Sequence, residues 1–313
     1  MKCLVTGATG FVGRELCRQL ADRELSFTAL SRSGASLPDG TGTEAVDFRS
    51  GQVNCQLLRG VDIVFHLAGI AHQQADDELY SRVNYRATLA LAEAAAAGGV
   101  KCFVYLSSVK AMGPAIDEEV RTEGQLSPPG DTYGLSKLRA EQGLQAAFAD
   151  GEMSVVILRP TLVYGYSVKG NLLLLSRAVR AGLPRPPAAG GRSMIAVQDL
   201  AGLLCQIADD PPPGFNTWIV CDGQRYSARR IYDLMREAEG KRPGISWLPL
   251  WAWRFAALLR DGLRRRGDDS TFLKLFGTEL YSSAALMRAM PWHPQRDLAD
   301  VVSGMMNDPN ESN

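Results

Sequence analysis

Tyr133 and Lys137 lie four residues apart in segment 131–141 and form the pair best suited to proton transfer in this chain. On a helix, residues i and i+4 share a face, so the ammonium of Lys137 can lie beside the phenol of Tyr133. An adjacent cation lowers the phenol pKa from its usual value of about 10, as a general acid or base requires. This spacing is also common by chance, so the pair alone does not establish an active site.

A glycine-rich turn follows a short β-rich run at the N-terminus. Residues 2–5 lead into Thr-Gly-Ala-Thr-Gly-Phe-Val-Gly, which ends at residue 13. Gly7 allows a tight turn, Gly10 lets the backbone approach a pyrophosphate, and Gly13 permits a helix to pack closely on a sheet. The helix N-terminus would offer N–H groups to the phosphates. The spacing departs from the standard Gly-x-Gly-x-x-Gly, so a turn without a ligand stays an alternative.

A third feature is an apolar, β-branched run over residues 100–108 that ends in Ser107 and Ser108. It predicts a buried strand of a parallel sheet, and ligands bind at the carboxyl ends of such strands. Ser108 is therefore predicted where a substrate oxygen would bind, although serines also end strands merely to begin turns. The three features in this order are much less probable by chance than any one of them.

Strand and helix patterns alternate through the first half of the chain. The predicted strands cover 2–5, 26–31, 61–67, 100–107 and 155–158, and the predicted helices cover 11–20, 76–97 and 132–149. Alternation of this kind predicts an α/β fold with a Rossmann-like, doubly wound parallel sheet and right-handed crossovers.

The later part of the chain predicts a second domain. Residues 193–197 and 217–221 look like a return to the sheet, and proline-rich breaks separate the remaining pieces. We predict a dinucleotide-binding Rossmann domain from 1–160 plus 190–222. A smaller, discontinuous α/β substrate-binding domain would comprise 161–189 plus 223–313.

Bulk properties favour a globular cytoplasmic protein. A chain of 313 residues with 46% hydrophobic content can bury a large core, and its zero formal charge gives no reason to expect a nucleic-acid partner. The six cysteines are scattered without a Cys-x-x-Cys pair, which predicts buried reduced thiols, and with three histidines we expect no metal site. The first predicted strand begins at residue 2, so no signal peptide is expected.

A family resemblance emerges from these motifs taken together. The glycine turn, the His-Leu-Ala-Gly run 66–69, Ser108, and Tyr133 with Lys137 occur here in that order. The chain resembles the extended short-chain dehydrogenase/reductase superfamily, within it the NAD-dependent epimerase/dehydratase family. It is most similar to UDP-N-acetyl-quinovosamine-type nucleotide-sugar 4-ketoreductases. One departure is Leu162, which stands where that family usually has an asparagine.

The resemblance implies roles for individual residues. Tyr133 would donate a proton to a sugar carbonyl, Lys137 would lower the tyrosine pKa and hold the nicotinamide ribose, and Ser108 would hydrogen-bond the carbonyl oxygen. Asn84 would support the active-site helix. Ser108, Asn171 and Arg192 would bind the substrate, the last two at its phosphates. Cofactor contacts are expected from Gly7, Thr9, Gly10, Phe11, Val12, Arg32, Asp47, Phe48, Leu67, Ala68, Gly69, Ser107, Tyr133 and Lys137, with Asp47 and Phe48 flanking the adenine.

The cofactor type depends on the end of the second predicted strand. NAD sites usually place an acid there to hold the ribose, whereas an arginine suits the 2′-phosphate of NADP. The chain has Leu30-Ser31-Arg32-Ser33 at this point, with no acid. The cofactor is thus NAD or NADP, and we predict that NADPH is accepted at least as well as NADH. A loop arginine exposed to solvent is the alternative.

The resemblance implies an oxidoreductase that reduces a UDP-4-keto-6-deoxy-N-acetylhexosamine at C4 in the biosynthesis of a surface polysaccharide sugar. The missing ribose acid favours a cofactor that exchanges at each turnover, as a reductase requires. The alternatives are a UDP-hexose 4-epimerase with tightly bound NAD and a non-catalytic nucleotide-binding sensor. A homodimer through the helices that begin near 76 and 132 is typical of the family.

A tryptophan-rich segment, 247–260, precedes three consecutive arginines at 264–266. Such a segment can dock on an anionic membrane surface, but it is too short to span a bilayer. We favour a substrate-domain helix with an exposed basic end, so membrane contact is not expected.

Overall fold

The computed structural model describes residues 1–50, 54–71, 76–115, 117–166, 171–263 and 271–306. Its centre is a seven-stranded parallel sheet in the order β11-β7-β5-β4-β1-β2-β3. These strands are β1 (Lys2–Thr6), β2 (Ser26–Ser31), β3 (Glu44–Ala45), β4 (Ile63–His66), β5 (Cys102–Leu106), β7 (Ser154–Pro160) and β11 (Phe215–Val220). The predicted α/β class and Rossmann-like doubly wound sheet are confirmed.

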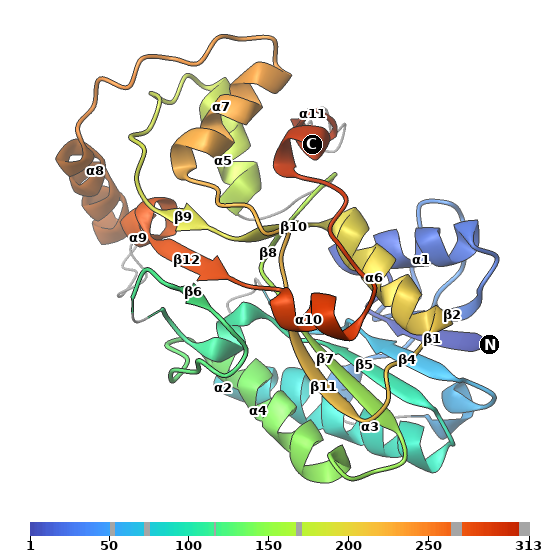
Figure 1. The fold of residues 1–313 in the computed structure, drawn as a ribbon. Helices are drawn as coiled ribbons and strands as arrows, with labels where there is room; N and C mark the ends of the chain where they lie inside the picture. Colours follow the sequence, from blue (N-terminus) through green and yellow to red (C-terminus); the bar gives the residue numbers. More distant parts are fainter. Residues whose placement is uncertain (51–53, 72–75, 116, 167–170, 264–270, 307–313) are drawn as a thin grey trace.

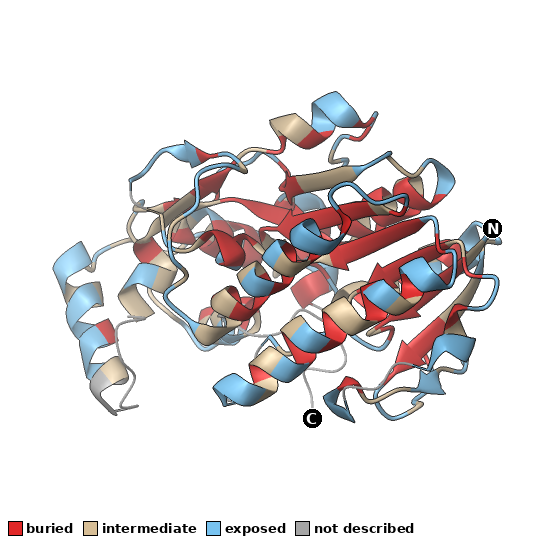
Figure 2. Cartoon of the chain, turned by 90° about the horizontal axis from the view of Figure 1, so that it is seen from below, coloured by how far each residue is buried: buried red, intermediate tan, exposed pale blue. Residues whose placement is uncertain are grey.

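Helices cover both faces of this sheet (Figure 1). On one face lie α1 (Phe11–Asp22) and α6 (Val197–Asp209), and on the other lie α3 (Ala87–Ala97) and α4 (Thr132–Phe148). Alternate strand residues point to opposite faces, so Cys3 and Val5 join the α1–α6 core while Leu4 joins the α3–α4 core. Figure 2 shows the buried strands between partly exposed helices. This packing explains the continuous apolar runs in the sequence.

The predicted helix over 76–97 is interrupted. It consists of α2 (Asp77–Tyr80), a π-helical stretch, η3 (Ser81–Arg86), and α3. Short 3-10 helices, η1 (Phe48–Ser50), η2 (Cys55–Leu58) and η4 (Val109–Met112), occur in the loops between strands.

The second lobe contains two small sheets and five helices of the described residues. One sheet pairs β8 (Leu162–Tyr164) with β10 (Met194–Ala196), and the other has the order β6 (Val120–Arg121), β12 (Thr278–Tyr281), β9 (Gly191–Arg192). These helices are α5 (Asn171–Arg180), α7 (Ala228–Ala238), α8 (Leu250–Leu263), α9 (Thr271–Phe276) and α11 (Leu298–Met306), whereas α10 (Ala284–Ala289) packs against β11 in the α1–α6 core of the main sheet.

One predicted sheet assignment is wrong. Residues 217–221 do return to the main sheet as part of β11, but 193–197 do not, because β10 pairs with β8 in a separate sheet. The strand edge beside β7 is already taken by β11, so β10 pairs with the strand that directly follows β7. The proposed division into two domains stays a prediction.

Asp222, directly after β11, joins the main sheet to the second lobe. Its carboxylate accepts hydrogen bonds from the hydroxyls of Tyr164 (2.9 Å) and Tyr226 (2.8 Å), and the Tyr226 hydroxyl accepts one from the backbone N–H of Leu298. Burial is the main reason that the pKa of Asp222 is raised. Asp222 thus binds β8 directly and α11 through the hydroxyl of Tyr226.

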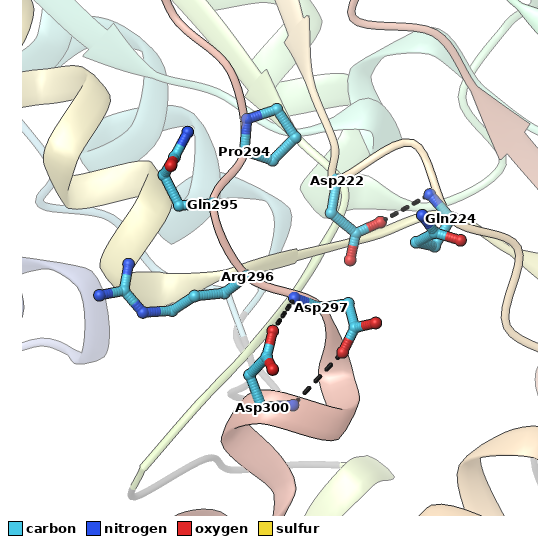
Figure 3. A pocket seen from close by; sticks show the side chains of 7 residues that line it. All are labelled: Asp222, Gln224, Pro294, Gln295, Arg296, Asp297 and Asp300. Atoms are coloured by element: carbon cyan, nitrogen blue, oxygen red, sulfur yellow. Dashed lines mark hydrogen bonds between the residues drawn. The ribbon is translucent and has the colours of Figure 1, made fainter.

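A hollow of about 230 Å³ lies at this junction (Figure 3). Within it, Asp297 and Asp300 exchange hydrogen bonds between side chains and backbone N–H groups at the start of α11, and Asp222 accepts one from Gln224 N. These acids thus cap a helix and a turn. The hollow is lined by Asp222, Gln224, Pro294, Gln295, Arg296, Asp297 and Asp300.

The cysteines are unpaired, and five of the six are buried as predicted, whereas Cys55 is exposed. Among the described residues, no helix is both long and apolar enough to cross a bilayer.

Candidate active site

The glycine-rich turn after β1 leaves no room for side chains. Gly7 has φ of +69°, and a Cβ at this position would lie 2.8 Å from the backbone nitrogen of Ala68. A Cβ on Gly13 would lie 2.2 Å from the carbonyl oxygen of Gly7. The first turn of α1 follows the N-cap Gly10, and no side chain caps it. The N–H groups of this turn are therefore available to a phosphate. This arrangement fits a dinucleotide pyrophosphate.

The other predicted residues of this turn divide into two kinds. Thr9 and Gly10 are exposed at its tip. The side chain of Phe11 packs against a cluster of the second lobe, and that of Val12 packs against the core of the sheet. Phe11 and Val12 can therefore contact a phosphate through their backbone N–H groups rather than through their side chains.

The loop after β4 forms the opposite wall. The N–H of Ala68 donates to the hydroxyl of Thr6 (3.1 Å), and Leu67 and Ala68 are half-buried. Gly69 is exposed, and a Cβ there would lie 3.1 Å from Asn84 Oδ1 and 3.4 Å from Lys137 Nζ. The loop thus runs from the glycine turn to the lysine.

His66, the last residue of β4, is buried beneath this loop. Its Nδ1 lies 2.8 Å from the Thr6 hydroxyl and its Nε2 lies 3.0 Å from the Thr88 hydroxyl. Because Thr88 donates to the carbonyl of Asn84, the network favours a ring that carries its proton on Nε2. Burial lowers the pKa of His66 to about 3, so the imidazole is neutral.

Asn84 lies in the π-helical stretch η3 and bridges two parts of the site. Its side chain pairs with the backbone of Ile70 (2.8 and 3.0 Å) and donates to Ser136 in α4 (3.0 Å). Single-turn π-helices are frequent at functional sites. These contacts hold the β4 loop against α4 and account for the interrupted helix.

The ammonium of Lys137 faces the carboxyl end of β5. It donates to the carbonyl of Leu106 (2.8 Å) and lies 4.6 Å from the centre of the Tyr105 ring. Burial lowers the pKa of Lys137 to about 8, and the nearby carboxylate of Glu141 opposes that shift.

Tyr133 is half-buried on the same helix, one turn before Lys137. Burial raises the pKa of Tyr133 to about 12, and a hydrogen bond with the side chain of Ser108 partly offsets this. The predicted lowering of the tyrosine pKa by Lys137 is therefore wrong. The ammonium is directed at Leu106 and Tyr105, and the desolvation of the phenol dominates. Tyr133 stays protonated, as a proton donor requires.

Ser107 and Ser108 have different partners. Ser108 is half-buried and associates with Tyr133, and its hydroxyl also caps η4. Ser107 is buried and donates to Glu141. Glu141 also forms a buried ion pair with Arg159 (2.7 Å). The hydroxyl of Ser107 is thus committed to a structural network rather than free for a cofactor.

Four residues that hold the site together were not predicted from the sequence: Glu141, Thr6, Thr88 and Ser136. Glu141 has a signal in the sequence, since it follows Lys137 by four residues and so shares a face with Tyr133 and Lys137. Thr6, Thr88 and Ser136 have none, because their partners are distant in sequence.

The edge formed by β2 and β3 carries charged side chains of both signs, Arg32 and Arg49 against Glu44 and Asp47. Arg32 is exposed at the end of β2, and Asp47 makes a two-pronged ion pair with Arg49 (2.5 and 2.9 Å). The hydrogen bond with Arg49 is the largest cause that lowers the pKa of Asp47, and Arg32 adds a smaller effect. Asp47 also lines a hollow of about 350 Å³. Phe48 is buried edge-on against His66, so its ring packs in the core instead of facing an adenine.

The two residues predicted to bind the substrate phosphates, Arg192 and Asn171, lie in the second lobe. Arg192 is half-buried in β9 and donates through Nη2 to the carbonyl of Lys274 (2.6 Å). Arg225 packs over the preceding Gly191, so a second guanidinium lies beside β9. Asn171 begins α5, and its side chain lies outside the described residues.

The fold and the site together define an oxidoreductase class. A glycine-rich turn fit for a dinucleotide, with serine, tyrosine and lysine at the end of β5, is suited to carbonyl chemistry next to a nicotinamide. Within the described ranges, no cluster of three His, Cys, Asp or Glu residues could hold a metal ion.

Sequence comparison gives the family. The model of the NAD dependent epimerase/dehydratase family matches residues 3–216, so the chain belongs to that family and is an enzyme, as predicted. A UDP-glucose 4-epimerase from Vibrio cholerae is 30% identical over 308 residues, which cover 95% of this chain and 92% of the relative. A UDP-2-acetamido-2,6-beta-L-arabino-hexul-4-ose reductase from Pseudomonas aeruginosa is 36% identical over 170 residues, 53% of this chain and 36% of the relative.

Solved structures agree on the fold. MoeE5 in complex with UDP-glucose and NAD has a TM-score of 0.78 at 24% identity and covers 100% of this chain and 99% of its own. The UDP-glucuronic acid 4-epimerase from Bacillus cereus in complex with NAD has a TM-score of 0.78 at 18% identity, with 99% of each chain covered.

Proposed function

We propose that this enzyme reduces the C4 carbonyl of a UDP-4-keto-6-deoxy-N-acetylhexosamine in the cytoplasm, in the biosynthesis of a surface polysaccharide sugar. The observation that carries the proposal is the convergence of Ser108, Tyr133 and Lys137 at the end of β5, beside the glycine-rich cradle. The Pseudomonas aeruginosa reductase supports this substrate class, since its name describes reduction of a UDP-linked 4-keto sugar.

The mechanism assigns one task to each residue. Tyr133, protonated because its pKa is high, donates its proton to the carbonyl oxygen as negative charge develops there. Ser108 donates a hydrogen bond to the same oxygen and stabilises that charge. Lys137, whose ammonium donates to the carbonyl of Leu106, would hold the nicotinamide ribose. The nicotinamide cofactor supplies the hydride when it is bound.

The preference between NADPH and NADH depends on the charged residues at the edge formed by β2 and β3, where the adenosine ribose would bind. Asp47 is neutralised by Arg49, and Arg32 stands exposed at the end of β2, so the edge suits a 2′-phosphate better than a ribose diol. We therefore propose that NADPH binds at least as tightly as NADH. The Arg32→Ala variant should lose affinity for NADPH by about tenfold and keep its affinity for NADH, because only NADPH carries the phosphate. Titration of nicotinamide fluorescence measures both affinities, and an unchanged NADPH affinity would remove Arg32 from the site.

For the substrate phosphates we propose Arg192 and Asn171. The remaining N–H groups of Arg192 suit a diphosphate, since a guanidinium fork binds two oxygens at once. Arg192→Ala should raise the Michaelis constant for the nucleotide sugar, and an unchanged constant would remove Arg192 from this role. A homodimer through α2, α3 and α4 stays a prediction.

A UDP-hexose 4-epimerase is the second candidate, favoured by the Vibrio cholerae relative that matches almost the whole chain. The same three residues would serve it, but an epimerase retains its cofactor through the cycle. The test is to mix catalytic amounts of enzyme with NADPH or NADH and the 4-keto sugar. A reductase oxidises the cofactor over many turnovers, and Tyr133→Phe slows this by about 10²–10⁴-fold. No oxidation, with NAD retained in the protein and UDP-hexoses interconverted at C4, would establish the epimerase instead.

A further inference from the structure

Exposed apolar side chains gather in one part of the second lobe. Of the fourteen large hydrophobic residues that are exposed among the described residues, eight fall between positions 245 and 273. They are Ile245, Trp247, Leu250, Trp251, Phe255, Leu258, Leu259 and Leu273. Single exposed apolar residues are ordinary on soluble proteins, but a contiguous group marks an interaction surface.

Within this group, α8 carries its apolar face on the outside. An α-helix turns roughly 100° per residue, so Trp251, Phe255, Leu258 and Leu259 share one side. Their exposed fractions are 73%, 60%, 58% and 55%. We call these four residues the α8 face. Figure 2 shows this helix at the edge of the molecule, pale blue along most of its length.

The opposite side of α8 holds the helix to the protein. Ala257 is only 5% exposed, and Trp253 meets Phe276 of α9 edge-on with ring centres 5.7 Å apart. Arg254, which is exposed and borders the α8 face, lies over the ring of Phe272, 6.0 Å from its centre. The helix is thus anchored by one side while the larger apolar side chains point to solvent, the reverse of an ordinary surface helix.

Charge indicates what covers the α8 face. The sequence of the helix contains Arg254, Arg260, whose side chain lies outside the described residues, and a single acid, Asp261, which accepts hydrogen bonds from Thr271. The sequence then continues into three arginines at 264–266, which lie outside the described residues. A second copy of this chain would offer the arginines of α8 no free carboxylate in the described part of that helix. Anionic lipid headgroups would neutralise them.

Composition and length also favour a lipid surface. Tryptophan, phenylalanine and leucine on one side, with arginines nearby, are typical of helices that lie in the plane of a bilayer interface. At 14 residues α8 is too short to span the bilayer. The helix also packs beside α9, whose Lys274 carbonyl accepts the hydrogen bond from Arg192, so it belongs to the part of the lobe that carries a proposed phosphate contact.

We propose that the α8 face docks on the surface of an anionic lipid bilayer, with α8 parallel to the membrane plane. This changes our expectation from sequence, which was a substrate-domain helix with an exposed basic end and no membrane contact. The docking does not depend on which sugar the enzyme reduces.

The test is co-sedimentation of the full chain with vesicles of phosphatidylcholine, with or without phosphatidylglycerol. We expect binding to the anionic vesicles that weakens as salt is added. The double variant Trp251→Ser/Phe255→Ser should reduce this binding at least about tenfold, because both side chains would leave the acyl boundary. The matched control is Leu126→Ser/Met287→Ser, which removes two exposed apolar side chains elsewhere and should bind as the parent does.

A second readout follows Trp251 directly. Its fluorescence should shift to shorter wavelength on anionic vesicles, and Trp251→Phe should keep the binding but lose most of that shift. Absence of parental binding to anionic vesicles would overturn the proposal, as would equal binding by the double variant. Light scattering that shows a dimer which the double variant abolishes, without vesicle binding, would assign the α8 face to a second copy of the chain.

Discussion

At the scale of single residues, the chemistry depends on two groups whose pKa values burial shifts in opposite directions. Burial raises the pKa of Tyr133 to about 12, which keeps the phenol neutral, and lowers the pKa of Lys137 to about 8, which brings its ammonium close to losing its charge. Because the pKa of Lys137 is the lower of the two, Lys137 loses its proton first as the pH rises.

The pH dependence of the reduction should therefore report Lys137. The folded pKa is below the usual 10.5, so the ammonium is present below about pH 8 and is lost as the pH rises through that value. We expect kcat/KM for reduction to be level below this pH and to fall by about tenfold per pH unit above it. Steady-state rates over a pH series measure it.

Lys137→Arg is the informative variant, because a guanidinium stays charged throughout. If it retains measurable activity, its profile should lack the fall near pH 8. A parental profile that stays level through about pH 10 would show that the charge on Lys137 is not required or that its pKa is not lowered.

At the scale of elements, the contact between β1, the glycine turn and α1 is fixed by backbone spacing. Gly13→Ala would place a Cβ 2.2 Å from the carbonyl of Gly7 and 2.9 Å from Ala8 Cα, both on the backbone. Overpacking of this kind costs about 1–3 kcal/mol of unfolding free energy. It would also distort the phosphate cradle, so we expect a lower Tm and at least about tenfold weaker nicotinamide binding.

Gly202→Ala in α6 is the matched control, since the nearest atom to its added Cβ is a side-chain oxygen 3.7 Å away. That substitution should be neutral or stabilise the protein by about 0.5–1 kcal/mol through helix propensity. Thermal unfolding and fluorescence titration compare the two variants. Parental affinity and Tm in Gly13→Ala would mean that the turn is not the tight contact described above.

At the scale of the whole molecule, the second lobe is joined to the sheet through Asp222. Asp222→Ala would leave the buried hydroxyls of Tyr164 and Tyr226 without their shared acceptor. Tyr164 can still donate to the carbonyl of Arg296, and an unsatisfied buried group costs about 1–3 kcal/mol, so we expect a loss of about 1–3 kcal/mol in unfolding free energy. The Michaelis constant for the nucleotide sugar should rise, because the two residues proposed to bind its phosphates lie in that lobe, whereas cofactor affinity should change little.

Asp222→Asn tests whether the junction needs the negative charge of the carboxylate or only an oxygen that accepts hydrogen bonds. Burial raises the pKa of Asp222, so a neutral amide that keeps one acceptor oxygen should cost much less than alanine. Denaturant unfolding and steady-state kinetics measure both effects. Equal stability of the alanine variant and the parent would contradict the role of this carboxylate as a junction.

The sequence by itself determined the class of fold and the positions of the reacting groups. Alternating apolar runs predict strands and helices because burial on a sheet follows the local period of each element, and Gly7, Gly13, Tyr133 and Lys137 act through spacings within one turn or one helix. These patterns are short-range and can be recognised without a fold.

The tertiary structure decided the partners of those groups. Lys137 is directed at Leu106 rather than lowering the pKa of Tyr133, Ser107 is committed to Glu141, and Phe48 packs against His66. The pairing of β10 with β8, and the outward direction of the α8 face, are likewise absent from the local pattern. Each depends on contacts between segments far apart in the chain, and the burial of a side chain is a property of that packing and not of its neighbours in sequence.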